Sequence, residues 1–307
     1  MQSLACFGPS FPKRRTLAYA QAGILFLLAA WLYAPFVVRL ASQWWQDPNY
    51  THGFFVPMFS LFLLWERRAK LAALRIKPAW PGLVMLLFAL WTLILGTIKS
   101  EFFLYRLSVL LFIAGVVVFL AGWKHLVAIS FPLAFLVLMI PSSTLLEQIT
   151  FPLQIIASKT ATFLLMLAGV PAVREGNIIL LPSAQLEVAE ACSGIRSLFS
   201  LLTLTIVYGY LAETKIGVRV LLALMAVPIA VLANALRIAF TGLVVEHWGV
   251  EHAEGMVHLL SGWLVFVASL ALIFLLHRLI QVLWLSQGEL GHDELVHDEP
   301  GVREEYA

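Results

Sequence analysis

The sequence predicts an all-α, polytopic membrane protein: a helical bundle of about eight transmembrane helices with both termini in the cytoplasm. Of its 307 residues, 61% are hydrophobic and only 12% are charged, whereas soluble domains carry roughly 25% charged residues. Several apolar runs reach the roughly 20 residues that cross a bilayer. Lysines and arginines gather in alternate loops, which orients the spans. The net charge of +2 is too small to indicate nucleic acid as a partner.

The first half of the chain contains five predicted spans. The KRR cluster at 13–15 places the leader, residues 1–16, in the cytoplasm. The stretch ERRAKLAALRIK after the second span carries five cations, the strongest orientation signal in the chain. The second span is short and must cross with local thinning of the bilayer. Trp44 and Trp45, which precede it, are expected to be interfacial anchors. The spans are predicted at Leu17–Val38, Phe54–Trp65, Pro81–Ile98, Leu107–Gly122 and Leu126–Ile140.

The second half contains three further predicted spans. Lys215 and Arg219 mark one cytoplasmic loop, and His277 and Arg278 mark the cytoplasmic end of the last span. We therefore expect one integral membrane domain over 17–286. The acidic composition of 287–307 predicts a disordered cytoplasmic tail. The three spans are predicted at Ser197–Leu211, Gly217–Val245 and Val257–Leu276.

The apolar segment Leu145–Ala168 does not fit a single crossing, because both of its flanks are predicted outside. Polar residues recur along it at helical spacing, which favours an interfacial or re-entrant amphipathic helix. A ninth span is the alternative. The following stretch GVPAVREGNIILLPSAQLEVAEA predicts an extracytoplasmic loop or short hairpin before Cys192. The polar residues are Glu147, Gln154, Ser158 and Thr162.

Three unusual residues are predicted to lie at a common depth near the outer face. Cys192 opens the sixth span, Arg237 lies in a span that runs outward, and His258 opens the last span. The other cysteine, Cys6, precedes the first span. Two cysteines so far apart predict neither a metal cluster nor a structural disulfide. We expect no metal and no cofactor.

The three residues together suit nucleophilic catalysis. A nearby cation raises the thiolate fraction of a cysteine, and the thiolate attacks carbonyl groups. An arginine can stabilise the oxyanion, and a histidine can transfer the proton. Each residue also has a structural interpretation. Cys192 can be a small buried side chain, Arg237 a partner for Glu190 or Glu246, and His258 an interfacial residue.

The motifs EACSGIRSL, NALRI and HLLSGWLVF resemble the three signature segments of the exosortase/archaeosortase family of membrane cysteine transpeptidases. The stretches DPNYTHGFFVP and GVPAVREGNIILLP are similar to its bacterial branch. The resemblance runs in order from about Trp44 to Phe274. It implies that Cys192 is the nucleophile, Arg237 the supporting cation and His258 the third catalytic residue. The archaeal branch has a second arginine at the position of His258, so the histidine indicates a bacterial exosortase.

The resemblance implies a substrate and a location. The substrate is a protein with a C-terminal PEP-CTERM signal: a Pro-Glu-Pro motif, one transmembrane helix and a short basic tail. The chain would act in the bacterial inner membrane with its active site facing the periplasm, and its setting would be exopolysaccharide and biofilm export. Its partners would be the tethered substrate, the lipid bilayer and an acceptor nucleophile that remains unidentified. The residues expected to bind substrate or support the trio are Arg174, Glu190, Ser193, Gly194, Arg196 and Asn234.

Two non-enzymatic interpretations compete with this one. A transporter would use Arg237, Lys159 and Glu147 as polar groups along a pathway, but transporters often show repeated halves, which we do not find. A non-catalytic component of polysaccharide export would tolerate substitution of all three candidate residues. Cleavage of a substrate separates the enzyme from both.

Overall fold

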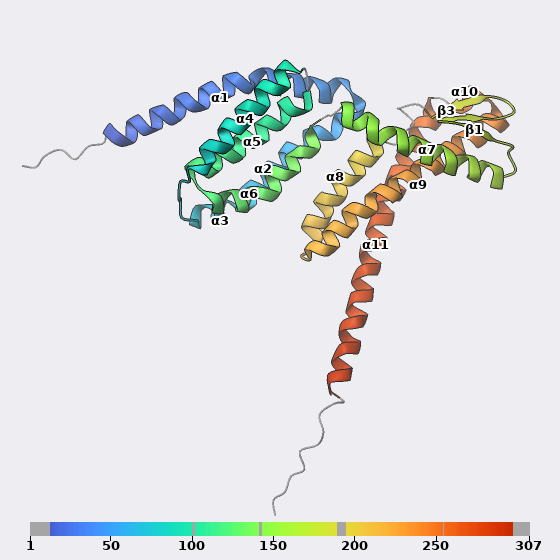
Figure 1. Cartoon of the computed structure of the whole chain (residues 1–307). Coiled ribbons are helices and arrows are strands. Elements are labelled where there is room, and N and C mark those ends of the chain that lie inside the picture. Colours follow the sequence, from blue (N-terminus) through green and yellow to red (C-terminus); the bar gives the residue numbers. More distant parts are fainter. Residues whose placement is uncertain (1–12, 100–101, 141–142, 189–194, 254, 297–307) are drawn as a thin grey trace, which may run out of the picture. The chain divides into compact units, whose positions relative to one another are not determined.

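Helices and one small sheet make up the regular secondary structure of the described residues (Figure 1). The computed structural model describes residues 13–99, 102–140, 143–188, 195–253 and 255–296. The chain divides into two compact units, Met1–Pro141 and Ser142–Ala307, each of which is described by itself.

A polytopic helical membrane protein is confirmed. In lipid every backbone polar group needs an internal partner, and a helix supplies it within one segment. Each of the eight predicted spans coincides with a helix, although the number of crossings and their direction stay predictions. In the described part of the chain, the helices long and apolar enough to cross a bilayer are Pro81–Ile98, Phe103–Leu120, Ile216–Trp248 and Leu259–Leu283. Shorter apolar helices are Trp123–Met139, Phe151–Leu167 and Arg196–Ala212.

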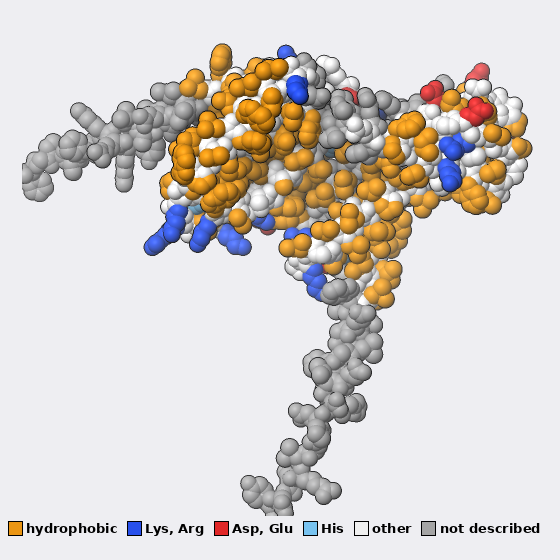
Figure 2. Space-filling view, in the orientation of Figure 1, with side chains coloured by type: hydrophobic (Ala, Val, Ile, Leu, Met, Phe, Trp, Pro, Cys, Tyr) orange, Lys and Arg blue, Asp and Glu red, His pale blue; other side chains and the backbone are white. Residues whose placement is uncertain are grey.

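The elements of regular secondary structure in the described part of the first unit are all helices. Its α-helices are α1 (Lys13–Gln46), α2 (Phe55–Glu66), α3 (Arg68–Ala73), α4 (Pro81–Ile98), α5 (Phe102–Leu120) and α6 (Trp123–Phe135). Two 3₁₀ helices, η1 (Pro48–Phe54) and η2 (Leu136–Met139), complete it. Figure 2 shows hydrophobic side chains over the visible face of α4 and α5, and lysines and arginines gathered around α3, as expected for the cation-rich loop.

Small residues let α4 and α5 pack closely. A Cβ atom on Gly82 would lie 2.3 Å from the backbone nitrogen of Phe119, and one on Gly96 would lie 2.5 Å from that of Tyr105. Real side chains do not tolerate such distances, so larger residues would push the helices apart. Between apolar helices in lipid, close van der Waals contact of this kind is a main source of association.

A proline in α6 explains where Arg67 binds. Pro132 has no N–H group to bond the carbonyl of Ala128, four residues earlier. Arg67 Nη1 donates to that carbonyl oxygen at 2.7 Å. On the neighbouring helix, Ser60 Oγ donates to the carbonyl of Pro132 at 3.1 Å. The carbonyls around the proline thus receive hydrogen bonds from α2 and the residue that follows it.

The prediction that Trp44 is an interfacial anchor is wrong. α1 continues to Gln46, and Trp44 is buried and donates from Nε1 to the carbonyl of Met139 at 3.1 Å. Its indole lies against Gly53, where any side chain would collide with the ring. Trp45, by contrast, is 83% exposed. His52 is also buried and bonds the carbonyl of Leu138 through Nε2, and burial lowers its pKa.

Over its described residues, the second unit contains five helices and a sheet. The helices are α7 (Ser143–Leu167), α8 (Ile195–Ala212), α9 (Ile216–Trp248), α10 (Val250–Ala253) and α11 (Met256–Val296). The strands are β1 (Val173–Glu175), β2 (Ile178–Leu180) and β3 (Gln185–Glu187). Since α11 continues to Val296, the first part of the segment 287–307 is helical. The division into leader, membrane domain and tail stays a prediction.

The predicted hairpin before Cys192 is present, with a third strand added. β1 and β2 pair antiparallel with Glu175 opposite Ile178, so Gly176 and Asn177 form a two-residue turn. Gly176 has φ +64°, the left-handed conformation that such turns require. β3 pairs antiparallel with β2 and places Leu186 opposite the fully buried Ile179. The sheet therefore packs one face against the helices.

The polar stripe of α7 faces the protein instead of water. Gln154, Ser158 and Thr162 are all buried. Ser158 Oγ lies 3.2 Å from the carbonyl of Gly176, within reach of a hydrogen bond, so the stripe contacts the hairpin turn. The exposed positions of the same helix are largely apolar, with Phe163 at 56%. The interfacial arrangement, which would turn these three residues to water, is thus wrong, and the re-entrant helix and the ninth span stay predictions.

Candidate functional site

Helix α9 connects two separate apolar cores of the second unit. One core, which we call the sheet-side cluster, joins the sheet, α7, α10 and the C-terminal half of α9. The other, the turn-side cluster, joins α8, the N-terminal half of α9 and α11. The sheet-side cluster is Ala157, Ala161, Leu165, Val170, Ala172, Ile179, Leu181, Val188, Ile238, Ala239, Val244, Val245 and Ala253. The turn-side cluster is Leu198, Leu201, Ala226, Ile229, Ala230 and Ile273.

Two candidate site residues lie where α9 passes from one cluster to the other. Ala230 belongs to the turn-side cluster and Ile238 to the sheet-side cluster. Asn234 and Arg237 occupy the interval between them. Asn234 is buried and Arg237 half-buried. Placing an arginine inside an apolar helix costs free energy, so its retention at this junction favours a functional role.

Helix α11 crosses the same junction and contacts Arg237. Val257 packs against the sheet-side cluster and Phe266 against the turn-side cluster. Between them, a Cβ atom on Gly262 would lie 3.4 Å from Arg237 Nη1. The missing side chain therefore leaves room for the guanidinium beside the backbone of α11.

His258 lies in the first turn of α11, four residues before Gly262. Residues four apart lie on one face of a helix. His258 therefore lies one turn before Gly262 on the same face of α11, and this is the face on which Gly262 contacts Arg237. Its side chain lies outside the described part of the structure.

The described residues on either side of the segment that contains Cys192 belong to different clusters. Val188 belongs to the sheet-side cluster and Leu198, on α8, to the turn-side cluster. Cys192 itself, with Glu190, Ser193 and Gly194, falls in 189–194, outside the described residues. The residues that flank this segment thus belong to the same two clusters that α9 and α11 connect.

The two remaining predicted arginines differ in their surroundings. Arg174 lies on β1 and donates from Nη1 to the carbonyl of Gly176 at 2.7 Å, which ties it to the hairpin turn. Arg196 is exposed in the first turn of α8. No described contact joins either of them to Arg237, so their part in the site stays a prediction.

A direct Arg237–Glu246 pair does not fit the helix. The two residues are nine positions apart on α9, about 13 Å along its axis, whereas side chains on one helix meet at three or four positions. Glu246 Oε2 instead accepts hydrogen bonds from the Ser183 hydroxyl at 2.6 Å and the Ser183 N–H at 3.3 Å. The carboxylate ties the β2–β3 loop to α9.

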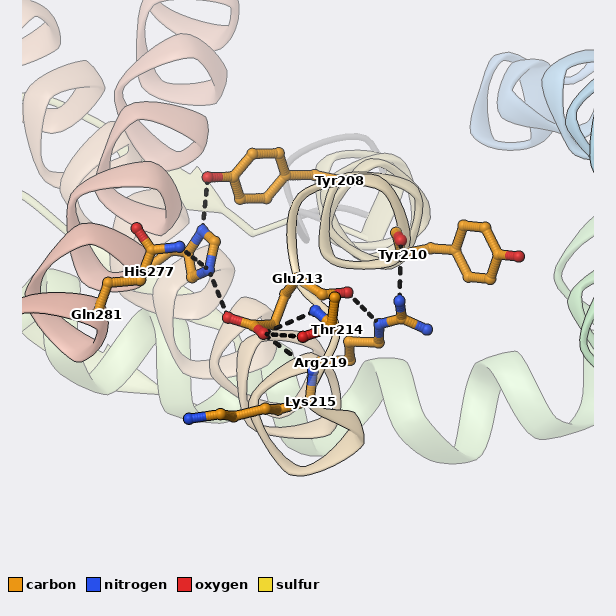
Figure 3. Close-up of polar contacts among 8 residues, drawn as sticks. All are labelled: Tyr208, Tyr210, Glu213, Thr214, Lys215, Arg219, His277 and Gln281. Atoms are coloured by element: carbon orange, nitrogen blue, oxygen red, sulfur yellow. Dashed lines mark hydrogen bonds and ion pairs between the residues drawn. The ribbon is translucent and has the colours of Figure 1, made fainter. Parts of the chain in front are cut away.

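A second polar cluster, not anticipated from the sequence, lies at the other end of α9 (Figure 3). His277 on α11 is 2% exposed, and its Nδ1 lies 2.7 Å from the Tyr208 hydroxyl. Its Nε2 lies 3.3 Å from Glu213 Oε2. A carboxylate can only accept, so Nε2–H donates to Glu213, and in the neutral ring Nδ1 then accepts from Tyr208. These bonds fasten α11 to the turn between α8 and α9.

The turn itself is held by backbone hydrogen bonds. Glu213 Oε1 accepts from the N–H groups of Thr214 at 2.7 Å and Lys215 at 2.9 Å. Arg219 donates from Nε to the carbonyl of Glu213 at 2.7 Å and lies over the Tyr210 ring. The pKa of Glu213 is lowered to about 2, chiefly by the backbone hydrogen bond from Lys215 and with smaller contributions from His277 and Thr214, against the opposing effect of desolvation. The charge pattern predicted that the Lys215–Arg219 loop and the end of the last span share the cytoplasmic side, but it did not specify that Glu213 meets His277.

We expect Glu213→Gln to destabilise the protein at neutral pH but not in acid. The pKa of Glu213 is below its ordinary value of 4.5, so the ionised group stabilises the folded protein above pH 4.5. That contribution is lost as the pH falls towards 2. At pH 7 the variant should melt about 2–6 °C lower than wild type, and the difference should shrink by pH 3. Thermal unfolding of the detergent-purified protein measures this.

Glu251→Gln, at an exposed position on α10, is the matched control. A gap between wild type and Glu213→Gln that is as wide at pH 3 as at pH 7 would contradict the assignment.

Among the described residues, no group of three His, Cys, Asp or Glu side chains could hold a metal ion. The fold and the junction together define a class: a polytopic helical membrane protein with a half-buried arginine held between two cores. A sequence profile of the transmembrane exosortase family matches residues 44–275. The chain belongs to the transmembrane exosortase family. Comparisons with curated proteins and with solved structures give no match.

Proposed function

We propose that this protein is a membrane cysteine peptidase or transpeptidase. It removes C-terminal PEP-CTERM sorting signals at the periplasmic face of the bacterial inner membrane and serves surface export linked to exopolysaccharide. One observation carries the proposal: Arg237 and the first turns of α11 meet at the junction between the two clusters. Val188 and Leu198, the described residues that flank the segment with Cys192, belong to the same two clusters. Family membership supports the exosortase-like activity.

The proposed reaction has two steps. The Cys192 thiolate attacks the carbonyl carbon next to the Pro-Glu-Pro segment, and a C–S bond forms. Arg237 donates hydrogen bonds to the negative oxygen of the tetrahedral intermediate. The C–N bond then breaks, and His258 gives a proton to the departing amine of the membrane-anchoring tail. An acyl-enzyme thioester remains.

The second step releases the product. An amine, a hydroxyl or water attacks the thioester carbon and gives its proton to His258. The C–S bond breaks and the thiolate of Cys192 leaves. The product is an ester, amide or free acid according to the acceptor, and the catalytic groups return to their starting protonation states.

Tethering of the substrate in the same bilayer would assist the first step. A substrate helix that ends at the outer face would present its Pro-Glu-Pro segment at the depth proposed for Cys192. Because the two partners share a membrane, binding gains effective concentration over encounter in solution. The substrate glutamate needs a cation, and the exposed Arg196, four residues after Cys192, is the nearest candidate along the chain.

The direct test uses a tagged substrate with the Pro-Glu-Pro motif, one helix and a basic tail, coexpressed with this protein. We expect a shortened product on a gel. Substrates in which the glutamate of the Pro-Glu-Pro motif is changed to alanine, or from which the transmembrane helix is removed, should keep their full length. Mass spectrometry of the product identifies the cleaved bond and the acceptor. An intact substrate beside membrane-inserted wild-type protein would favour a transporter or an assembly component.

A further inference from the structure

One end of the first unit carries exposed cations on two segments that are far apart in the sequence. Arg75 and Lys77 lie in the loop between α3 and α4, and Lys124 lies in the first turn of α6. All three side chains are exposed. Figure 2 shows lysines and arginines gathered at this end, around α3. The proposed reaction does not use them.

Backbone contacts hold the two segments together. The Lys77 N–H donates to the carbonyl of Ala121 at 3.1 Å, and the Ala79 N–H donates to the carbonyl of Val118 at 3.2 Å. Gly122, with φ +95°, lies so close to the carbonyl of Lys77 that a Cβ atom would collide with it. The loop before α4 and the turn after α5 therefore form one surface. We call it the basic surface, and it consists of Arg75, Lys77, Trp80, Trp123 and Lys124.

The basic surface lies where two long apolar helices end. α4 begins at Pro81 and α5 ends at Leu120, and both are long and apolar enough to cross a bilayer. Just beyond these ends, Trp80 is 70% exposed and Trp123 is 50% exposed. Tryptophans, whose amphipathic rings lie at the level of the headgroups, are enriched at membrane–water interfaces. We therefore expect the basic surface at the depth of lipid headgroups.

The charge at this end of the unit is strongly positive. Residues 61–81 contain five lysines and arginines and one acidic residue, Glu66, whereas residues 118–126 contain Lys124 and no acidic residue. One carboxylate cannot neutralise so many cations. The surface therefore keeps a positive charge and attracts anions.

The neighbouring apolar side chains distinguish between possible anions. A soluble acidic protein would need only the cations, whereas this surface also exposes the indole rings of Trp80 and Trp123. The exposed side chains Val84 and Leu87 continue the apolar surface along the first turns of α4. Charged groups followed directly by apolar helix surface match a molecule with a charged head and apolar chains. These features favour an anionic phospholipid.

We propose that the basic surface binds the headgroups of anionic phospholipids: Arg75, Lys77 and Lys124 contact the phosphates, and the acyl chains lie along the exposed apolar side of α4. The inference does not depend on the proposed peptidase activity, because the candidate catalytic residues belong to the other unit. Lipids bound here would hold the start of α4 and the end of α5 at the level of the headgroups.

The test is lipid retention by the purified full-length protein. Delipidated protein in detergent is mixed with equal amounts of phosphatidylglycerol and phosphatidylcholine, and the adducts are counted by native mass spectrometry. We expect wild type to prefer phosphatidylglycerol. The triple variant Arg75→Gln/Lys77→Gln/Lys124→Gln should lose about tenfold or more of that preference, since each cation near a lipid surface contributes about fivefold. The charge-preserving variant Arg75→Lys/Lys77→Arg/Lys124→Arg should behave like wild type.

The matched control removes three exposed cations from other places: Arg39→Gln/Lys99→Gln/Lys159→Gln. It should lose less than about twofold of the preference. An equal loss in both triple variants would show general surface attraction and overturn the proposal. Stronger binding of soluble poly-glutamate than of phosphatidylglycerol in the same mixture would replace the lipid by an acidic protein partner.

Glu66→Gln tests the proposal without weakening the basic surface. Because it removes the one acidic residue of 61–81, it should raise the preference for phosphatidylglycerol by about twofold to fivefold. An unchanged or lower preference would contradict the electrostatic argument. Unchanged melting temperatures confirm that the variants are folded.

Discussion

Cys192→Ala is expected to abolish cleavage of the tagged substrate, with a loss of at least about 10⁴-fold. The side chain is the only proposed nucleophile, and the remaining groups can only bind and polarise the substrate. The assay is the ratio of full-length to shortened substrate in membranes that contain equal amounts of enzyme. Cys192→Ser should be almost as inactive, since a hydroxyl is a far weaker nucleophile than a thiolate.

The matched control is Cys6→Ala, the other cysteine of the chain. It should cleave at the wild-type rate, and a thiol reagent should still inactivate it. Full processing by Cys192→Ala would eliminate the cysteine mechanism outright. Loss of activity in Cys6→Ala would point instead to a disulfide or to damage unrelated to the active site.

Arg237→Gln is expected to lower the cleavage rate by about 10²–10³-fold, the usual cost of removing one oxyanion donor. The same change removes the cation that favours the thiolate, so it should also slow alkylation of Cys192. We would measure alkylation from pH 6 to pH 9 in the Cys6→Ala background. The alkylation rate of Arg237→Gln should begin to rise at a higher pH than the rate of the parent. Without the arginine, a smaller fraction of Cys192 is thiolate at neutral pH.

Gly262 provides an independent test of the same geometry. Gly262→Leu keeps Arg237 but fills the space that its guanidinium occupies, since even a Cβ atom there would lie 3.4 Å from Nη1. We expect a loss of activity similar to that of Arg237→Gln. Ala268→Leu, at an exposed position on α11, should be neutral. If Arg237→Gln alkylates and cleaves like wild type, the arginine is structural and the proposed junction site is wrong.

The sequence was informative wherever one physical rule dominates a segment. Apolar runs must become helices in lipid, and each predicted span coincides with one. The stretch GVPAVREGNIILLPSAQLEVAEA predicted an extracytoplasmic loop or a short hairpin, and the structure has the hairpin, with Gly176 and Asn177 at its turn. The third strand, β3, was not predicted. Its residues carry no pattern that distinguishes a short strand from a loop.

The sequence was misleading where polarity alone was used to infer exposure. The polar stripe that includes Ser158 favoured an interfacial or re-entrant helix, and Trp44 was expected at the interface. Both are buried, because partners from distant segments satisfy their polar atoms: the carbonyl of Gly176 for Ser158 and the carbonyl of Met139 for Trp44. In a membrane protein the outside is apolar, so a polar helix face is as readily turned inward as outward.

The sequence by itself determined the helical membrane class and the positions of the helices. It also identified Cys192, Arg237 and His258 as the candidate catalytic residues. These depend on local composition and on motifs. Only the tertiary structure decided that Arg237 lies against Gly262, that α9 joins two separate cores, and that Glu213 meets His277. Each of these contacts joins residues far apart in the chain. They form because helices pack through surfaces whose shape depends on all the side chains at once, so no single segment specifies them.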